Sequence, residues 1–251
     1  MRSIKMTKPI ALQLWSVQDE TEKDFFGTLE KVAEMGYDGV EFAGYYGKTA
    51  DEIQVKLAEL GLKAAGSHIQ YEQFLTNLDE VLAFEKVLGN KNLIVPWAAF
   101  DTVEEWQLFA DNMKTIAEKV TAAGFNFSYH NHNHEFEELN GQPILTWLLQ
   151  EVPTLNVELD TYWVQFAGVD AVEYMANYAG RMKLVHLKDQ KENPIESTEI
   201  GNGVLDIASY VKQAEENGVD WFVIEQEAFT QPTLKSVEIG LINLKRIIAE
   251  G

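Results

Sequence analysis

"EMGYDGVEF", residues 34–42, holds the pattern that decides the fold: the end of a helix-like segment, a glycine, and then a short apolar run. Glycine adopts the left-handed conformation that commonly ends a helix at little cost, so the chain can turn there into a strand. Gly36 occupies the turn and Glu41 lies in the run that follows. This stretch therefore predicts a helix that leads at once into a strand.

The same junction recurs along the chain. Five further segments repeat the order of helix, glycine and apolar run: ELGLKAAGSH (59–68), VLGNKNLIVP (87–96), AAGFNFSYH (122–130), YAGRMKLVHL (178–187) and ENGVDWFVIEQE (216–227). A seventh junction, EVPTLNVELD (151–160), uses Pro153, which also stops a helix. Together with the first apolar run, IALQLWSV (10–17), these junctions predict eight strands.

The segments before the junctions have the apolar spacing of helices. One face of a helix would carry Phe25, Leu29, Val32 and Ala33, and another would carry Val237, Leu241, Leu244 and Ile248. Strands that alternate with helices predict a parallel sheet, and eight such units predict a closed (β/α)8 TIM barrel. An open doubly wound sheet is the alternative. We expect a single domain over residues 1–251, in which residues 1–8 form a short N-terminal extension.

Composition narrows the class of protein. The chain has no cysteine, which excludes disulfides and thiolate metal ligands and suits a cytoplasmic protein. A net charge of −20 would repel polyphosphate backbones, so we expect no nucleic-acid partner. No apolar run approaches the ~20 residues of a membrane span, and the basic start MRSIKMTKPI lacks the apolar stretch of a signal peptide. We expect no membrane partner, and the sequence leaves homo-oligomerisation open.

The site candidates follow from the barrel, because TIM-barrel active sites lie at the C-terminal ends of the strands. All five histidines fall at predicted strand ends, three of them in YHNHNHEF (129–136). Side chains alternate along a strand, so His130 and His132 share a face, as do Glu158 and Asp160. Imidazoles and carboxylates without thiolates suit one divalent metal ion, and ligand type alone does not choose among Mn²⁺, Zn²⁺, Co²⁺, Mg²⁺ and Fe²⁺.

The chain resembles the xylose-isomerase-like TIM barrels, also called sugar phosphate isomerases/epimerases, over nearly its whole length. The resemblance rests on ALQLWSVQDE (11–20), MGYDGVEFAG (35–44), GLKAAGSH (61–68), YHNHNHEF (129–136), VELDTYWVQFAG (157–168), LVHLKD (184–189), EIGNGVLD (199–206) and VIEQE (223–227). It implies one divalent metal, held at the ends of strands five to eight by Glu, Asp, His and Glu in that order. Asp160, His186 and Glu225 match the last three of these ligands.

The first ligand departs from the family pattern. The common Glu-Asn-His of strand five reads His-Asn-His here, so His130 stands where a glutamate is expected. The resemblance implies that the epimerases of the family use that glutamate and the one on strand eight to move protons on opposite faces of the substrate. A symmetrical pair of carboxylate bases is therefore not expected in this chain.

These observations predict a metal-dependent enzyme that isomerises or epimerises a sugar, a polyol or a related hydroxy-carbonyl compound through an enediolate. The expected metal ligands are His130, Asp160, His186 and Glu225. Glu225 is expected to act also as the base, with His132 or His130 as its partner on the other face. The expected substrate contacts are Trp15, Glu41, His68, Trp97 and Lys188.

Three alternatives remain at this point. A keto-sugar lyase or dehydratase needs the same enolisation, and the missing glutamate favours it. A non-catalytic sugar- or metal-binding barrel would bind ligand without proton exchange. An endonuclease of this superfamily would need several metals and a basic surface, and the net charge of −20 argues against it.

Overall fold

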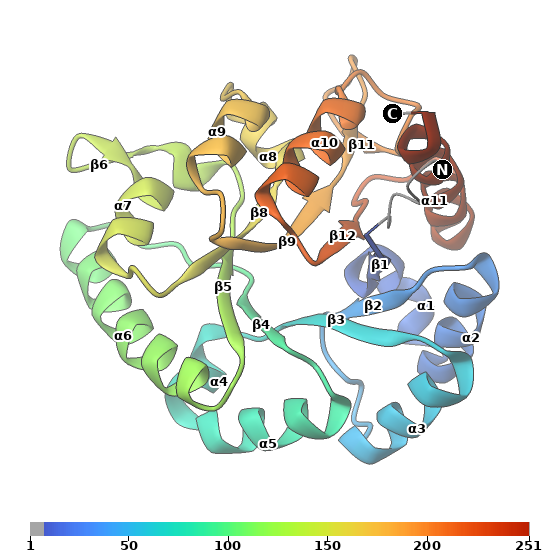
Figure 1. Cartoon of the computed structure of the whole chain (residues 1–251), viewed down its shortest axis with the longest axis horizontal. Helices are drawn as coiled ribbons and strands as arrows, with labels where there is room; N and C mark the ends of the chain where they lie inside the picture. Colours follow the sequence, from blue (N-terminus) through green and yellow to red (C-terminus); the bar gives the residue numbers. More distant parts are fainter. Residues whose placement is uncertain (1–7, 251) are drawn as a thin grey trace, which may run out of the picture.

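The computed structural model describes residues 8–250, and its centre is a closed barrel of eight parallel strands (Figure 1). In order around the barrel these are β1 (Ile10–Gln13), β12 (Trp221–Ile224), β9 (Met182–Leu187), β8 (Asn156–Asp160), β5 (Asn126–His130), β4 (Asn92–Val95), β3 (Lys63–His68) and β2 (Gly39–Phe42). The first strand pairs with both β12 and β2, which closes the sheet and rules out the open doubly wound alternative. The predicted TIM barrel is confirmed. Apart from Lys8, the expected N-terminal extension lies outside the described residues.

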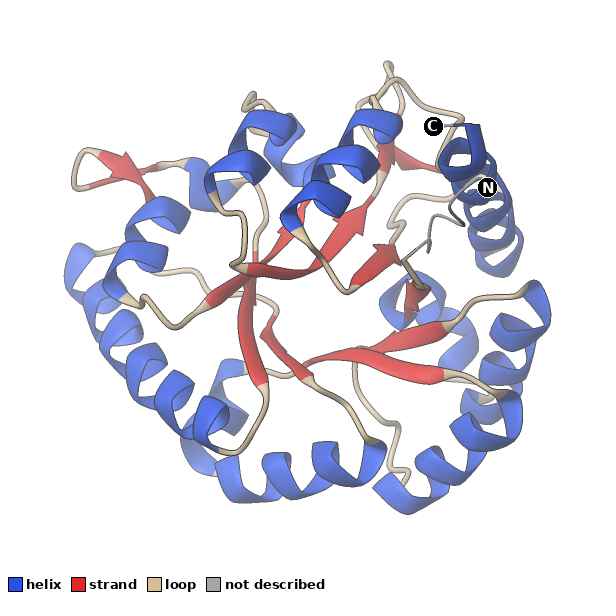
Figure 2. Ribbon diagram, in the orientation of Figure 1, coloured by secondary structure: helices blue, strands red, loops and turns tan. Residues whose placement is uncertain are grey.

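Helices surround the barrel on all sides (Figure 2). The longer ones are α2 (Phe25–Met35), α3 (Ala50–Leu60), α5 (Leu78–Leu88), α6 (Val103–Ala122), α7 (Ile144–Glu151), α10 (Ile207–Asn217) and α11 (Thr233–Glu250). Short helices are η1 (Leu14–Val17), α1 (Gln18–Thr21), α4 (Tyr71–Thr76), η2 (His134–Phe136), α8 (Thr161–Phe166) and α9 (Ala171–Asn177). Two small hairpins pair β6 (Glu138–Leu139) with β7 (Gln142–Pro143) and β10 (Asp189–Gln190) with β11 (Ser197–Thr198). Among the described helices, none is long and apolar enough to cross a membrane.

The helix ends confirm the junction pattern. Gly36 ends α2 with a φ of 91°, and its N–H bonds back to the carbonyl of Ala33. The predicted inner faces are buried as well: Phe25, Leu29 and Val32 lie in the main core between helices and strands. Burial of these faces against the barrel is the main source of helix stability, because isolated helices of this length are marginal in water.

The first strand is shorter than predicted, since it ends at Gln13 and the 3₁₀ helix η1 follows. The Gln13 side chain causes the turn: its Oε1 accepts the N–H of Trp15 at 3.0 Å, and its Nε2 donates to Glu41 Oε2 at 2.7 Å. Trp15 therefore leaves the strand and is 49% exposed.

A small apolar cluster fills the interior of the barrel. It contains Ala11, Ala65, Leu184 and Val223, with Trp221 packed against them. Because side chains alternate along a strand, the residue two positions after each of these also points into the barrel. Gln13 follows Ala11 in this way, His186 follows Leu184, and Glu225 follows Val223. Alternation along the strands thus changes the interior from apolar to polar toward the C-terminal ends.

Candidate active site

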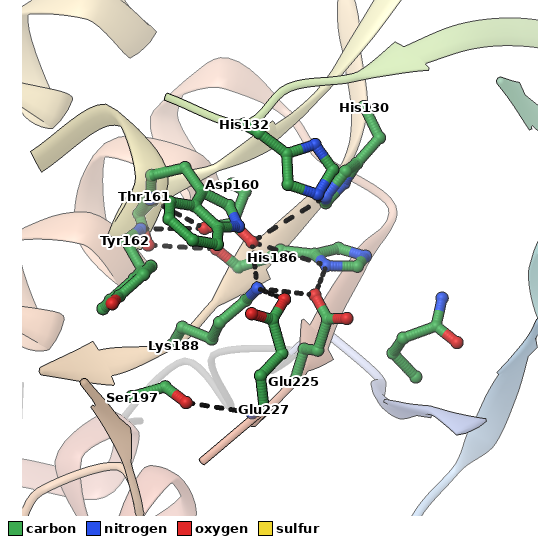
Figure 3. A network of polar contacts seen from close by, with 12 residues as sticks. His130, His132, Asp160, Thr161, Tyr162, His186, Lys188, Ser197, Glu225 and Glu227 are labelled. Carbon is green, nitrogen blue, oxygen red and sulfur yellow. Dashed lines mark hydrogen bonds and ion pairs between the residues drawn. The ribbon is translucent and has the colours of Figure 1, made fainter. Parts of the chain in front are cut away.

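Four side chains converge at the C-terminal ends of neighbouring strands (Figure 3). They are His130 of β5, Asp160 of β8, His186 of β9 and Glu225, which directly follows β12. One ligand atom from each lies within 4.8 Å of those of the others, and all four residues are buried. The structure therefore brings together the four residues that the sequence predicts as metal ligands.

The backbone around Asp160 fixes its carboxylate. Its Oδ1 accepts the N–H groups of Tyr162 at 2.9 Å and Trp163 at 3.1 Å, so the aspartate caps the first turn of α8. Asn131 accepts the N–H of Asp160 at 3.0 Å and joins the ends of β5 and β8. Capping leaves Oδ2 directed into the cluster, 3.9 Å from His130 Nε2.

His186 lies between two carboxylates. Its Nδ1 is 2.8 Å from Glu225 Oε2, and its Nε2 is 2.7 Å from Glu41 Oε2. Burial opposes protonation, but the charges of Glu158 and Glu41 raise the pKa of His186 well above its usual value. Glu41, predicted as a substrate contact, is fully buried beneath this imidazole. A Cβ at Gly66 would lie 2.6 Å from Glu41 Oε1, so the glycine makes room for the carboxylate.

Lys188 lies in the same layer and is fully buried. Its Nζ is 3.0 Å from Asp160 Oδ2, 3.0 Å from Glu225 Oε2 and 2.7 Å from Glu227 Oε1 (Figure 3). These carboxylates outweigh the effect of burial and raise the pKa of Lys188 well above its usual value. The ammonium, predicted as a substrate contact, is therefore held as the counter-ion of three carboxylates.

A second group adjoins the first and contains a residue that sequence reasoning missed. Glu158 Oε2 lies 2.7 Å from His68 Nε2 and 3.2 Å from His130 Nδ1. Burial and the charge of Glu41 raise the pKa of Glu158 to about 7, while Glu41 and Glu158 overcome burial and raise the pKa of His68 to about 9. Glu158 could have been found from its position two residues before Asp160 on the same strand, since this spacing directs both side chains into the barrel.

The loop after β5 shapes the opposite side of the site. His132 lies between the rings of Trp97 and Trp163, with centroid distances of 4.7 and 5.5 Å. Burial, aided by the charge of Lys188, lowers the pKa of His132 to about 3, so its imidazole is neutral at pH 7. Glu135, which sequence reasoning also missed, holds this loop by accepting the N–H of His132 at 2.7 Å and the hydroxyl of Tyr129 at 2.6 Å.

A pocket of about 470 Å³ opens directly above these groups. Its lining includes the predicted Trp15, His68, Trp97, His130, His132 and Glu225, together with Glu227, Tyr45, Gln70 and Gln73. Trp15 and Trp97 are 49% and 48% exposed, which is unusual for such large rings. The pocket thus joins aromatic walls to a polar floor, as small-molecule sites commonly do.

The residues present fit a divalent metal ion. Two imidazoles and two carboxylates are suitable donors for a first-row metal. Burial, together with the neighbouring imidazoles and Lys188, lowers the pKa of His130 well below its usual value, so a neutral nitrogen lone pair is available. Asp160 Oδ2 is buried, and Lys188 Nζ lies 3.0 Å from it; His130 Nδ1 is buried 3.2 Å from Glu158 Oε2. A divalent ion would add positive charge where these buried carboxylates gather.

The family model described as "Xylose isomerase-like TIM barrel" matches residues 29–247. The chain belongs to this family. An inosose dehydratase of Geobacillus kaustophilus is 22% identical, and the match covers 79% of this chain and 79% of its own. "Inosose dehydratase 2" of Bacillus cereus is 23% identical and covers 87% of this chain and 88% of its own.

Two solved structures share the fold of this chain. A sugar phosphate isomerase/epimerase from Parabacteroides distasonis is 26% identical, with a TM-score of 0.83 over 95% of this chain and 98% of its own. An L-ribulose 3-epimerase has a TM-score of 0.74 at 15% identity and covers 97% of both chains. The family resemblance inferred from the motifs is thereby confirmed, and the chain is similar to enzymes that process sugar-like compounds.

Proposed function

We propose that this chain is a metal-dependent enzyme that removes the proton next to a carbonyl in a sugar or polyol and thereby isomerises or epimerises it. The observation that carries the proposal is the convergence of His130, Asp160, His186 and Glu225, two of which, His130 and Glu225, line an aromatic-walled pocket. Enolisation needs a cation beside the carbonyl oxygen and a base beside the α-carbon, and this site offers the groups for both.

The metal would be held by those four side chains. When bound, a divalent ion would polarise the carbonyl and stabilise the negative charge of an enediolate. Glu41 supports the arrangement from below, because its contact with His186 Nε2 fixes the ring with Nδ1 toward Glu225. A carboxylate partner of this kind commonly sets the tautomer and orientation of a ligating histidine.

Glu225 is the proposed base. Burial raises the pKa of Glu225, but the charge of Lys188, aided by the hydrogen bond with His186, outweighs burial and keeps the carboxylate ionised. It would take the α-proton while the C–H electron pair forms the carbon–carbon double bond and the carbonyl oxygen gains the charge. If the proton returns to the former carbonyl carbon, and the hydroxyl proton of the former α-carbon passes to the former carbonyl oxygen, an isomer forms. Return of the proton to the opposite face of the α-carbon, with the carbonyl restored, gives an epimer. His132 lines the pocket and is the proposed proton carrier for that opposite face.

A specific observation favours a second candidate, the dehydration of a keto-sugar or keto-polyol. His130 occupies the strand-five position where the family pattern has glutamate, so the carboxylate base on that side is missing. Elimination needs only one base: Glu225 takes the α-proton, and the hydroxyl on the next carbon leaves as water with that proton. The inosose dehydratases that resemble this chain over most of their length support this candidate.

Product analysis tests the proposal and separates the two candidates. Metal-loaded protein would be incubated with a panel of ketohexoses, ketopentoses and an inosose. Isomerisation or epimerisation should give a product of unchanged mass, whereas dehydration should give one lighter by one water. Failure of the metal-loaded protein to convert any of these compounds would count against the enzyme and favour a non-catalytic binding barrel.

The metal itself can be tested without turnover. Protein prepared without chelator should hold roughly one divalent ion per chain, as one four-ligand site implies. His186→Ala and Asp160→Asn should each lower that occupancy, and the amide should retain the cap on α8. Asp170→Asn is the matched control, because Asp170 caps α9 in the same way but lies outside the cluster. Unchanged metal content in both site variants, measured by elemental analysis, would place the metal elsewhere.

A further inference from the structure

We infer that the pocket selects an uncharged, unphosphorylated sugar or cyclitol. This inference rests on the proposed function, since it names the substrate class of the same site. It differs from what the names of some structural relatives suggest, because those names include sugar phosphates. Three features of the described residues carry it: the charge of the pocket lining, the loop after β9 and the loop after β12.

Among the described residues, no lysine or arginine lines the pocket, whereas the carboxylates of Glu225 and Glu227 do. The His68 imidazole in the lining is already paired, with Glu158 Oε2 at 2.7 Å and Glu41 Oε2 at 3.3 Å. The nearby ammonium of Lys188 is fully buried and lies within 3.0 Å of three carboxylates. Away from the metal site, a phosphate dianion would therefore meet like charge and no unpaired cationic side chain, which is unfavourable in a partly desolvated pocket.

The loop after β9 has the form of an anion site, but the protein fills it with its own carboxylate. TIM barrels frequently bind phosphate through backbone N–H groups of the loops that follow strands seven and eight. Here Asp189 accepts four such groups, those of Gln190 and Gly201 at 2.8 Å and those of Gly203 and Leu205 at 3.1 Å. A Cβ at Gly203 would lie 2.2 Å from Asp189 Oδ1, so the loop closes tightly around the carboxylate.

The N–H groups of the loop after β12 are also used within the protein. Ser197 of β11 accepts the N–H of Glu227 and the N–H of Ala228 through its hydroxyl oxygen, both at 2.9 Å. The two loops that would hold a phosphate are thus joined to each other. Backbone donors that are already satisfied gain little from a new anion, because an existing hydrogen bond must first break.

The remaining surfaces suit a neutral ring. Trp15 and Trp97 present large aromatic faces at the pocket, and the side chains of Gln70 and Gln73 add neutral polar groups. Aromatic faces pack against the C–H surface of a ring, while amides bond its hydroxyls. Neither kind of contact needs a charged substituent on the ligand.

Matched ligand pairs that differ by one phosphate test the inference. The probes are D-fructose against D-fructose 6-phosphate and myo-inositol against myo-inositol 1-phosphate, titrated into metal-loaded protein by calorimetry and by tryptophan fluorescence. We expect the neutral member of each pair to bind at least about tenfold more tightly. That preference should persist in 0.5–1 M salt, where the Debye length falls to about 3–4 Å and the overall negative charge of the chain is screened.

A pocket variant provides the matched comparison. Gln73 lines the pocket from α4 and is exposed, so Gln73→Lys should fold normally while it adds one cation. Gln73→Lys should reduce the ratio of the affinity for the neutral probe to the affinity for its phosphate ester. Gln73→Met removes the amide without adding charge, so it should weaken both members of a pair alike and leave that ratio unchanged. Equal or tighter binding of the phosphate esters by the native protein would overturn the inference and leave the proton-transfer proposal standing. Tight binding of the neutral probes, with no conversion of any ketohexose, ketopentose or inosose of the panel, would reject the proposed function and support the inference.

Discussion

Glu225→Gln should reduce turnover of a confirmed substrate by at least the ~10²-fold that is typical of losing a general base. The amide keeps the size of the side chain and one coordinating oxygen, so fold and sugar binding should survive. It removes the negative charge that meets both His186 Nδ1 and Lys188 Nζ, so metal binding should weaken as well. Turnover is to be measured at saturating metal, which separates loss of the base from loss of the ion.

Glu227→Gln is the matched comparison for this variant. This substitution removes one negative charge, as Glu225→Gln does, but at a residue two positions later in the sequence. Like Glu225, Glu227 contacts Lys188 and lines the pocket. Because Glu227 is not among the converging ligand residues, the expected loss of turnover is less than about tenfold. Near-normal turnover in Glu225→Gln, or an equal loss in both variants, would reject Glu225 as the base and direct attention to His130 and His132.

Lys188→Met should destabilise the metal-free protein by about 3–5 kcal/mol, the usual cost of removing one partner from a buried ion pair. The substitution leaves the carboxylates of Asp160, Glu225 and Glu227 without the ammonium that lies within 3.0 Å of each. A divalent ion bound to Asp160 and Glu225 would supply positive charge to the same group. Added metal should therefore stabilise Lys188→Met more than it stabilises the native protein.

Urea unfolding with and without metal measures this effect. Lys191→Met is the control, because Lys191 forms one exposed ion pair with Glu196 at 3.3 Å and such pairs contribute about 0–1 kcal/mol. If Lys188→Met is too unstable to purify without metal, purification with metal present provides the comparison. Equal destabilisation in the two variants, or no difference in the response to metal, would contradict the role assigned to Lys188.

Much of the fold follows from local rules that the sequence displays directly. Gly36, Gly61, Gly89 and Gly218 each end a helix in the left-handed conformation, and each is followed by a barrel strand. These turns depend on residues close together in the chain, which is why the pattern predicts them. The end of β1 was predicted wrongly because it depends on Gln13, whose side chain bonds to Glu41, 28 residues further along.

The positions of the strand ends, together with the family resemblance, account for the part of the site that the sequence predicted. His130, Asp160, His186 and Glu225 were placed at strand ends, and the structure brings them together. How deeply each polar side chain is buried could not be predicted, because burial depends on the length of the side chain and on the residues opposite it. Glu41 and Lys188 were expected to contact substrate. In the structure Glu41 is a buried partner of His186, and Lys188 is a buried partner of three carboxylates. Glu158 joins the buried group through its contact with His68, which belongs to a strand 90 residues away in the sequence. A contact between such distant residues depends on the whole fold, so no local pattern predicted it.

Exchange with solvent deuterium reports on removal of the α-proton by Glu225, the step with which isomerisation, epimerisation and dehydration all begin. Metal-loaded native protein and Glu225→Gln would be incubated in D₂O with each keto-sugar and inosose of the panel, and the substrate carbons examined by NMR. With the native protein we expect deuterium at the carbon next to the carbonyl in recovered substrate or isomerised product, or loss of that carbon's hydrogen in a dehydrated product, and either change should be at least ~10²-fold slower with the variant. Conversion of a substrate by the native protein with that carbon–hydrogen bond left intact would contradict the proposed proton removal.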